Sequence, residues 1–161
     1  VIGSDGGNWF NTFLIDKGEE DGIEKDMNVI AGSGLVGIVI DTGANYAKVR
    51  SIIDDASNVS GMTLLNADRC IVSGNLATMN KGQVIEFSSL KCTDEEVEAG
   101  EQIVTSHISD KYLAGILIGY VSTIERDSNN LTYSGTVTPA VDFQHLQEVL
   151  VILDKKAKLR D

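Results

Sequence analysis

The chain has 161 residues, of which 42% are hydrophobic and 23% charged, and it contains a single proline. This length and composition fit one globular domain or two small ones, and they exclude a disordered chain. The formal net charge of −11 argues against sequence-independent binding to nucleic acid, which needs clustered lysine and arginine, and against adsorption to anionic lipid. A basic partner would suit this charge.

The two ends of the chain read as connecting segments. Residues 1–8, "VIGSDGGN", are rich in glycine, aspartate and asparagine and are expected to be a linker, and residues 154–161 form a charged tail. No apolar run is long enough to span a membrane, and no signal peptide is visible. The protein is therefore either cytosolic or a piece whose upstream anchor has been removed. Two cysteines, Cys70 and Cys92, are too few for a disulfide framework; they either pair or, more simply, are two separate buried side chains.

Short apolar or alternating runs separated by turn residues dominate the sequence. No segment repeats apolar residues at helical spacing for three turns, so the pattern predicts an all-β fold with little helix. About eleven strands are expected, at 11–16, 27–31, 34–41, 46–53, 57–64, 69–74, 83–88, 101–106, 115–125, 131–138 and 147–153.

One stretch of the sequence recurs. "GIEKDMNVI" at 22–30 matches "EVEAGEQIV" at 96–104, 74 positions later, and each copy then reaches a Gly-x-Val, at Gly37 and at Gly119. The second copy takes eight more residues to reach it. The shared unit is a tight turn with a positive φ, then a strand, then a second strand in which glycine marks a bulge or a close backbone approach. Two similar β-barrels in tandem are therefore predicted.

The predicted barrels span residues 9–75 and 76–146, and the strand at 147–153 is free to return to the first. Pro139 cannot donate to a sheet ladder, so it is expected to end the strand before it. Asp142 is then expected to accept an N–H bond from the backbone two or three residues on, which starts a short turn. The final "EVLVIL" is apolar at nearly every position and is expected to be buried on both faces.

Motifs for catalysis or cofactor binding are weak. The glycines of "GSGLVG", 32–37, precede a β-branched run and fit a hairpin better than a dinucleotide loop. The acidic residues at 94–101 lack the spacing of a calcium loop, and neither His107 nor His145 has a second ligand at metal spacing. Ser106 adjoins His107, but neighbours on a strand point to opposite faces. The sequence thus predicts no catalytic residue, no metal site and no cofactor.

Three side chains are candidates for contact with a partner protein, because aromatic residues are the usual anchors of interfaces. Trp9 lies near the N-terminal edge, where core and interface are equally suited to it. Tyr112 and Leu113 lie in the eight-residue excess of the second copy, "SDKYLAGI". A Tyr–Leu pair in a long loop favours an exposed contact.

Three stretches together, in order, resemble the rod shape-determining protein MreC family. They are "NWF…LIDKGEEDGIEKDMNVIAGSGLVGIVIDTGANYAKVRSIID", "AGILIGYVSTIE" and "VTPAVDFQHLQEVLVI", and the resemblance runs from about Trp9 to Ile152. It departs at "TSHISDKYLAGI", which lacks the family's Phe-Pro and leaves the conformation of that loop open. The positions that the motifs mark as structural are Gly34, Gly37, Gly119, Pro139, Asp142 and Phe143.

The resemblance implies two β-barrels side by side in a non-enzymatic, extracytoplasmic scaffold of the cell-elongation machinery, held to the membrane by a single N-terminal anchor. It implies a homo-oligomer, with a dimer favoured, that contacts a class B penicillin-binding protein and MreD, and indirectly RodA and MreB. Two other functions remain open. One is a degenerate two-barrel hydrolase of the serine-protease type, with His107 or His145 as base; the other is a carbohydrate-binding β module.

Overall fold

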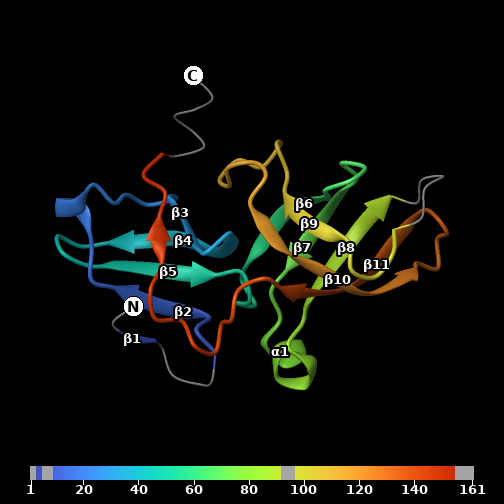
Figure 1. The fold of residues 1–161 in the computed structure, drawn as a ribbon, viewed down its shortest axis with the longest axis horizontal. Coiled ribbons are helices and arrows are strands. Elements are labelled where there is room, and N and C mark those ends of the chain that lie inside the picture. Colours follow the sequence, from blue (N-terminus) through green and yellow to red (C-terminus); the bar gives the residue numbers. More distant parts are fainter. Residues whose placement is uncertain (1–2, 5–8, 92–96, 155–161) are drawn as a thin grey trace.

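The computed structural model describes residues 3–4, 9–91 and 97–154. This part of the chain forms two units side by side (Figure 1), and each of the eleven predicted strands overlaps an observed one. The described residues contain β1 (Gly3–Ser4), β2 (Thr12–Ile15), a 3-10 helix η1 (Glu19–Asp21), β3 (Asn28–Ala31), β4 (Gly34–Thr42), β5 (Ala47–Ser51), β6 (Asn58–Thr63), β7 (Arg69–Ser73), α1 (Leu76–Gly82), β8 (Ile85–Lys91), β9 (Gln102–Thr105), β10 (Leu117–Arg126), β11 (Thr132–Pro139) and β12 (Leu150–Val151).

Six strands close into a barrel, on the right of Figure 1. The order is β6-β7-β8-β11-β10-β9, and β9 pairs again with β6 to complete the ring. All of these pairings are antiparallel. Phe87, Ile103, Ile118 and Val137 are among the buried side chains that fill the interior, as the alternation of inward and outward residues in a small barrel requires.

The other unit is an open sheet in the described residues. Its order is β1-β2-β5-β4-β3-β12, and no pairing joins β12 to β1 in the part of the chain that the structure describes. The fold is therefore all-β with one closed six-stranded barrel beside a six-stranded open sheet. The run β1-β2-β5-β4-β3 in the open sheet corresponds to the run β7-β8-β11-β10-β9 in the barrel.

The strand pairings move the expected boundary between the units. β6 and β7 were expected in the first barrel, within 9–75, but they pair with β9 and β8 and belong to the closed barrel. β12, within the strand expected at 147–153, follows the closed barrel in the chain and pairs with β3 of the open sheet. Periodicity identifies strands but does not reveal their neighbours, because pairing is decided by which edges the tertiary fold leaves available.

The internal repeat is confirmed by matching backbone geometry. Asp26 and Gly100, 74 positions apart, both adopt a positive φ, 72° and 95°. The Asp26 N–H donates to the Val39 carbonyl at 2.9 Å, and the Gly100 N–H donates to the Val121 carbonyl at 2.7 Å. The two turns therefore place equivalent strand pairs, β3–β4 and β9–β10, in the same way.

The repeat also explains the path of the C-terminal segment. Each copy gives its last strand to the other: β6 pairs with β9, and β12 pairs with β3. The Leu64 N–H donates to the Gln102 carbonyl at 3.0 Å, and the Ile152 N–H donates to the Asn28 carbonyl at 2.8 Å. Leu64 and Ile152 are 88 positions apart, and Asn28 and Gln102 are 74 apart, so one register holds in both places. This mutual exchange ties the two units together.

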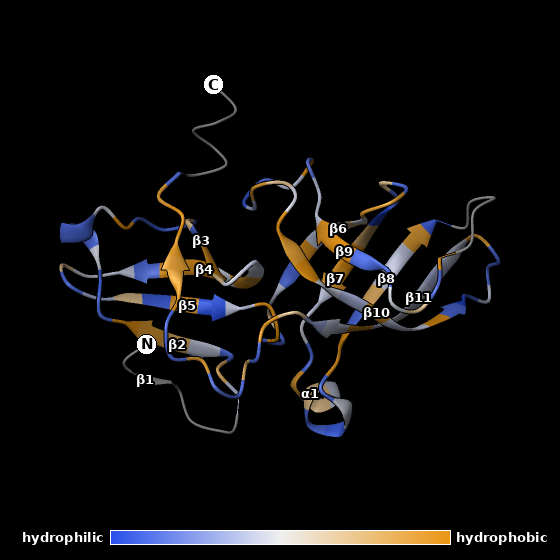
Figure 2. Cartoon of the chain, in the orientation of Figure 1, coloured by the Kyte–Doolittle hydropathy of each residue, from blue (hydrophilic) through white to orange (hydrophobic). Residues whose placement is uncertain are grey.

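Burial agrees with the predicted pattern in the middle of the chain and departs from it at the end. Along β5, Ala47, Val49 and Ser51 are buried and the residues between them are half-buried, as period-2 alternation predicts. The expectation that "EVLVIL" is buried on both faces is wrong, since Leu150 and Leu153 are 64% and 54% exposed. β12 is hydrophobic (Figure 2). It is the last strand of the open sheet, paired with β3, and in Figure 1 it passes in front of β4 and β5.

Helix α1 was not predicted. Its N-cap is Asn75, whose side-chain oxygen accepts the Thr78 N–H at 3.2 Å, and its seven residues make only two turns, too few for a helical period to show. The expected linker contains the short strand β1, which pairs with β2; residues 1–2 and 5–8, and the tail from 155 on, lie outside the described residues. None of the described helices has the length and apolar character to cross a bilayer.

Candidate functional site: the junction of the two units

The two sheets join where β4 meets β10. Leu117 and Gly34 form a parallel bridge between these strands, and the segment after β11 passes over the same point. A Cβ atom at Gly34 would lie 2.7 Å from Cγ2 of Val141 and 3.3 Å from Cβ of Ala140. Glycine is therefore needed at Gly34 for the crossing segment to pack closely against β4.

The two glycines of the repeat occupy equivalent crowded places. Gly37 lies opposite Ser51 in the β4–β5 ladder, and Gly119 lies opposite Pro139 in the β10–β11 ladder. A Cβ atom at Gly37 would lie 2.0 Å from the Arg50 carbonyl oxygen, and one at Gly119 would lie 2.2 Å from the Thr138 carbonyl oxygen. Both are close backbone approaches, as the sequence predicts for a glycine inside a strand.

The loop between β9 and β10 reaches from the closed barrel to the open sheet, where Asn28 holds it. The Asn28 amide nitrogen donates to the Lys111 carbonyl at 2.9 Å, and its amide oxygen accepts the Leu113 N–H at 2.8 Å. Asn28 is buried, so these bonds satisfy an amide that has no access to water. Sequence reasoning missed this residue, although an asparagine inside the apolar run "MNVI" is the kind of residue that needs partners.

Tyr112 does not form the exposed contact that its loop position favours. It is only 6% exposed, and this burial raises its pKa to about 12, against the opposing influence of the nearby Ser57 hydroxyl and Arg50 guanidinium. Leu113 beside it is half-buried. The loop thus turns its aromatic residue inward, where it helps to fill the junction.

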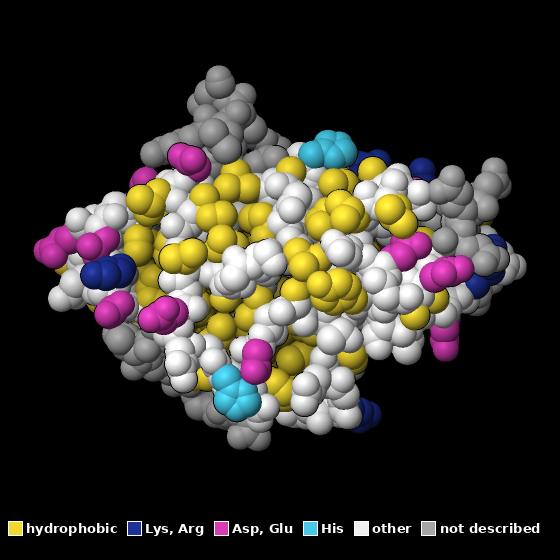
Figure 3. All heavy atoms as spheres, in the orientation of Figure 1, with side chains coloured by type: hydrophobic (Ala, Val, Ile, Leu, Met, Phe, Trp, Pro, Cys, Tyr) yellow, Lys and Arg dark blue, Asp and Glu magenta, His cyan; other side chains and the backbone are white. Residues whose placement is uncertain are grey.

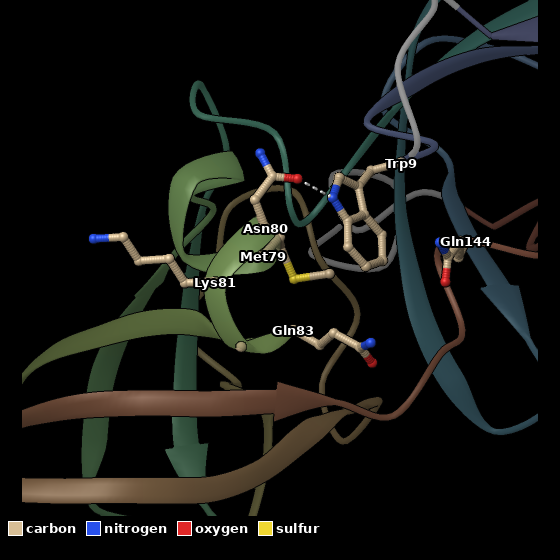
Figure 4. A pocket seen from close by; sticks show the side chains of 7 residues that line it. Trp9, Met79, Asn80, Lys81, Gln83 and Gln144 are labelled. Carbon is tan, nitrogen blue, oxygen red and sulfur yellow. Dashed lines mark hydrogen bonds between the residues drawn. The ribbon is translucent and has the colours of Figure 1, made fainter.

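Trp9 lies between the units and lines two shallow cavities. Its indole nitrogen donates to the Asn80 side-chain oxygen of α1 at 2.7 Å, and Figure 4 shows the ring between α1 and the segment that carries Gln144. The cavities have volumes of about 410 and 420 Å³, and both are also lined by Met79 and Gln83. Trp9 is half-buried, so it serves the core and also leaves aromatic surface accessible.

The crossing segment begins as the sequence predicts. Pro139 is the last residue of β11, and the Asp142 carboxylate accepts the Gln144 N–H at 3.0 Å. Phe143 is buried, and its carbonyl accepts the Phe10 N–H at 3.0 Å. The turn is therefore anchored on both sides, by a backbone cap and by a core side chain.

The histidines do not form a hydrolytic site with a neighbouring serine. His145 Nδ1 lies 2.9 Å from Asp142 Oδ2, with both side chains exposed, and this hydrogen bond is the main cause that lowers the pKa of Asp142. Ser106 is buried and its hydroxyl accepts the Ile108 N–H, whereas His107 is exposed. Among the described residues, no group of three or more His, Cys, Asp or Glu side chains could hold a metal ion.

Cys70 is a buried free thiol on β7. Burial raises its pKa to about 12, so the unreactive thiol is the stable form at neutral pH. Cys92, its possible disulfide partner, lies outside the described residues, as do residues 93–96 of the acidic segment.

Comparison with known proteins gives one consistent result. The sequence model of the family described as "Rod shape-determining protein MreC, barrel core" matches residues 1–153. The cell shape-determining protein MreC of Listeria monocytogenes is 31% identical over 155 residues, which cover 94% of this chain and 51% of that protein. This chain thus spans about half the length of that relative.

Solved structures agree with this match. A Listeria MreC structure superposes with a TM-score of 0.82 at 32% identity, covering 94% of this chain and 71% of that one. An MreC from Helicobacter pylori, solved in a complex with penicillin-binding protein 2, superposes with a TM-score of 0.67 at 16% identity, covering 93% and 91% of the two chains. The second likeness concerns the fold alone.

Proposed function

Because the chain belongs to the MreC family of rod shape-determining proteins, we propose that it is the non-enzymatic, partner-binding part of an extracytoplasmic scaffold for cell elongation. The scaffold would be held at the outer face of the cell membrane by a segment upstream of this chain. It would self-associate as a dimer, bind a class B penicillin-binding protein and MreD, and reach RodA and MreB indirectly.

The observation that carries this proposal is the match of residues 1–153 to the MreC family. One protein named MreC has been solved in a complex with penicillin-binding protein 2. The junction supports a binding function physically. It is fixed by buried groups such as Asn28 and Tyr112 and crossed by exchanged strands, and it presents Trp9 beside two shallow cavities. A rigid surface with a half-buried aromatic residue suits protein binding, because little ordering is needed when the partner docks.

A hydrolase is the less well supported function. Asp142 and His145 have the hydrogen bond of a carboxylate–histidine pair, but both are exposed, and Thr138 supplies the one hydroxyl among the described residues that line the adjacent cavity. A hydrolytic triad needs a nucleophile within hydrogen-bond reach of the base and a pocket for the oxyanion. A fluorophosphonate probe should therefore leave the chain unlabelled, and labelling that is lost in His145→Ala would support the hydrolase instead.

The test is direct binding of the ectodomain of the class B penicillin-binding protein from the same organism to the immobilised chain. Saturable binding is expected, and Trp9→Ala should weaken it about tenfold if the indole is an interface anchor. Gln144→Trp, which fills the cavities from an exposed position, should weaken binding without loss of the core. Tyr120→Ala, on the outer face of β10, is the matched control.

Two results would contradict the proposal. One is the absence of binding up to about 100 μM, where the free energy of association is only about −5.5 kcal/mol. The other is specific retention of the chain on purified peptidoglycan that is lost in Trp9→Ala, which would favour a carbohydrate-binding module.

A further inference from the structure

Strand pairing joins the two units at a single point. Among the described residues, the pair Leu117–Gly34 is the only ladder contact between the open sheet and the closed barrel. Two loops, residues 52–57 and 140–149, carry the chain from one unit to the other. One residue pair fixes a point of contact but not an angle, and loops can absorb a rotation. The orientation of the units is therefore set by contacts on either side of this bridge.

One of these contacts is the loop at residues 106–116, which we name the strap. It leaves β9, reaches the open sheet and returns to β10. Asn28 of β3 bonds to it twice, at the Lys111 carbonyl and at the Leu113 N–H. The side chain between these two residues, Tyr112, is buried. The strap thus binds the open sheet through two hydrogen bonds and one aromatic ring.

The strap is suited to open while both units stay folded. Six of its eleven residues are exposed, so few contacts outside Asn28 and Tyr112 hold it down. Arg50 Nε, on the open sheet, is buried without a hydrogen-bond partner in the described residues, and it lies 3.6 Å from Asp54 Oδ2, too far for a good hydrogen bond. Burial raises the pKa of Tyr112, and the nearby Arg50 guanidinium acts against this rise. A lifted strap would let water reach Arg50, which offsets part of the cost of opening.

A second contact between the units lies on the opposite side of the bridge. The Trp9 indole N–H donates to the Asn80 side-chain oxygen of α1 at 2.7 Å, and we name this hydrogen bond the latch. In Figure 1 the strap lies at the upper edge of the molecule and α1 at the lower edge. One histidine belongs to the strap and the other lines a cavity beside Trp9, and Figure 3 shows the two histidines at these opposite edges.

The strap and the latch depend on the same orientation of the units. Each joins the open-sheet side to the closed barrel, so a rotation about the bridge moves both. The latch is sensitive to a small rotation, because its 2.7 Å distance needs to grow by less than about 1 Å to leave hydrogen-bond range. Two contacts that require one orientation stabilise each other, and this coupling is equal in both directions.

We propose that the strap is a conformational switch, which holds the surface around Trp9 in its rigid form from the opposite side of the molecule. With the strap docked, Asn80 binds the indole beside the two cavities that Trp9 lines. When the strap lifts, the units rotate slightly, the latch opens and the surface loosens. A ligand that lifts the strap would thereby lower the affinity of the Trp9 surface for its partner, because a loosened surface must be ordered again on binding.

This inference concerns the regulation of the surface assigned under the proposed function, but its test needs no partner, so the two can fail separately. Trp9 is the only tryptophan of the chain, and acrylamide quenching of its fluorescence reports how accessible the indole is. Asn80→Ala should raise the quenching constant about twofold, because the indole loses its acceptor. Asn28→Ala and Tyr112→Ala release the strap, and each should raise the constant in the same direction.

Three comparisons distinguish coupling from general loosening. Ile108→Ala, at a strap residue that is 45% exposed, should leave the quenching constant unchanged. The double variant Asn28→Ala/Asn80→Ala should match Asn80→Ala, since both changes act through the latch, whereas independent effects would add. In the reverse direction, Asn80→Ala should speed hydrogen exchange of the Leu113 N–H about twofold by NMR, because the coupling is reciprocal.

Circular dichroism checks that each variant is folded at the temperature of the measurement. Asn80 is exposed, so its variant stays informative even if Asn28→Ala and Tyr112→Ala unfold. An unchanged exchange rate of the Leu113 N–H in Asn80→Ala would overturn the proposal. Quenching constants equal to that of the parent in folded Asn28→Ala and Tyr112→Ala would overturn it as well, and so would additive effects in the double variant or an equal rise in Ile108→Ala.

Discussion

The closed barrel and the open sheet are built on one plan and differ at one strand. In the closed barrel, β6 pairs with β7 through five residue pairs and seals the ring. In the open sheet, the equivalent strand β12 pairs with β3 through two and with no other strand of the described residues. The shared turns and glycines maintain the plan in both units, so the repeat keeps its register although only one unit closes into a ring in the described residues.

The largest effect on stability is expected at the two glycines of the repeat, Gly37 and Gly119. Substituting each in turn tests whether the two copies contribute equally to the free energy of unfolding. Gly37→Ala and Gly119→Ala each place a methyl group against a backbone carbonyl, and backbone cannot move aside as a side chain can. Each should lower the free energy of unfolding by about 3 kcal/mol or more, measured by urea denaturation.

Gly82→Ala, at the end of α1 with no atom within 4 Å of the added methyl, is the control. It should be neutral or stabilise the protein by up to about 1 kcal/mol. If Gly37→Ala lowered the free energy of unfolding and Gly119→Ala did not, the two copies would share their backbone geometry without contributing equally to stability.

Asn28 and Gln102 occupy equivalent positions of the repeat, 74 residues apart. The Asn28 side chain is hydrogen-bonded to the loop between β9 and β10, whereas Gln102 is exposed. Asn28→Ala leaves the Leu113 N–H and the Lys111 carbonyl without their amide partner, which should cost about 2 kcal/mol. Gln102 is exposed, and Gln102→Ala should change stability by less than about 0.5 kcal/mol. Thermal and urea unfolding of both variants would measure this, and equal costs would rule out a special role for Asn28.

Asp54 and Asp142 lie 88 positions apart, the same separation as between β6 and β12. Each carboxylate accepts the N–H of the residue two positions later, Ala56 or Gln144, and so begins a turn. The half-buried Asp54 carboxylate accepts bonds from the Ala56 N–H and the Asn11 amide, whereas the exposed Asp142 bonds to Gln144 and His145. Asp54→Ala should cost about 1.5 kcal/mol and Asp142→Ala about 0.5 kcal/mol.

The acid side of the pH profile tests the same turn. The pKa of Asp142 is lowered in the folded chain, so its small stabilisation is present above the unfolded pKa near 3.8 and is lost as the pH falls below it. The Asp142→Ala variant should show a flatter acid limb than the parent chain. A steeper limb would contradict the assigned hydrogen bond.

The closed barrel and the junction each hold one buried group that ionises at alkaline pH, Cys70 and Tyr112. Burial raises the pKa of Cys70 from 9.0 to about 12 and that of Tyr112 from 10.0 to about 12. The unfolded chain loses these protons first, so stability is complete below the unfolded values and falls as the pH rises toward 12.

Tyr112→Phe should remove about 1 kcal/mol of the loss between pH 10 and pH 11, and Cys70→Ala should flatten the profile from about pH 9. Urea denaturation at several pH values measures both. An unchanged slope in Tyr112→Phe would mean that water reaches the phenol.

Most of the secondary structure and part of the site could be predicted. Alternation located β5, and the turns at Asp26 and Gly100 were found from one local match because their signals lie within a few residues. α1 was missed because two turns leave no period. Tyr112 was expected to be exposed but is buried. Its loop is hydrogen-bonded to Asn28, more than eighty positions earlier in the chain, and nothing near Tyr112 in the sequence indicates that contact.

The sequence by itself determined the all-β class, the strands, the repeat, the break at Pro139 and the family, because each depends on local backbone preferences or on motifs read in order. Only the tertiary structure decided which strands are neighbours, that β6 and β12 are exchanged between the units, and that one unit closes into a barrel while the other is an open sheet in the described residues. Strand pairing joins residues far apart in the chain, and it is settled by which edges remain after the core has packed.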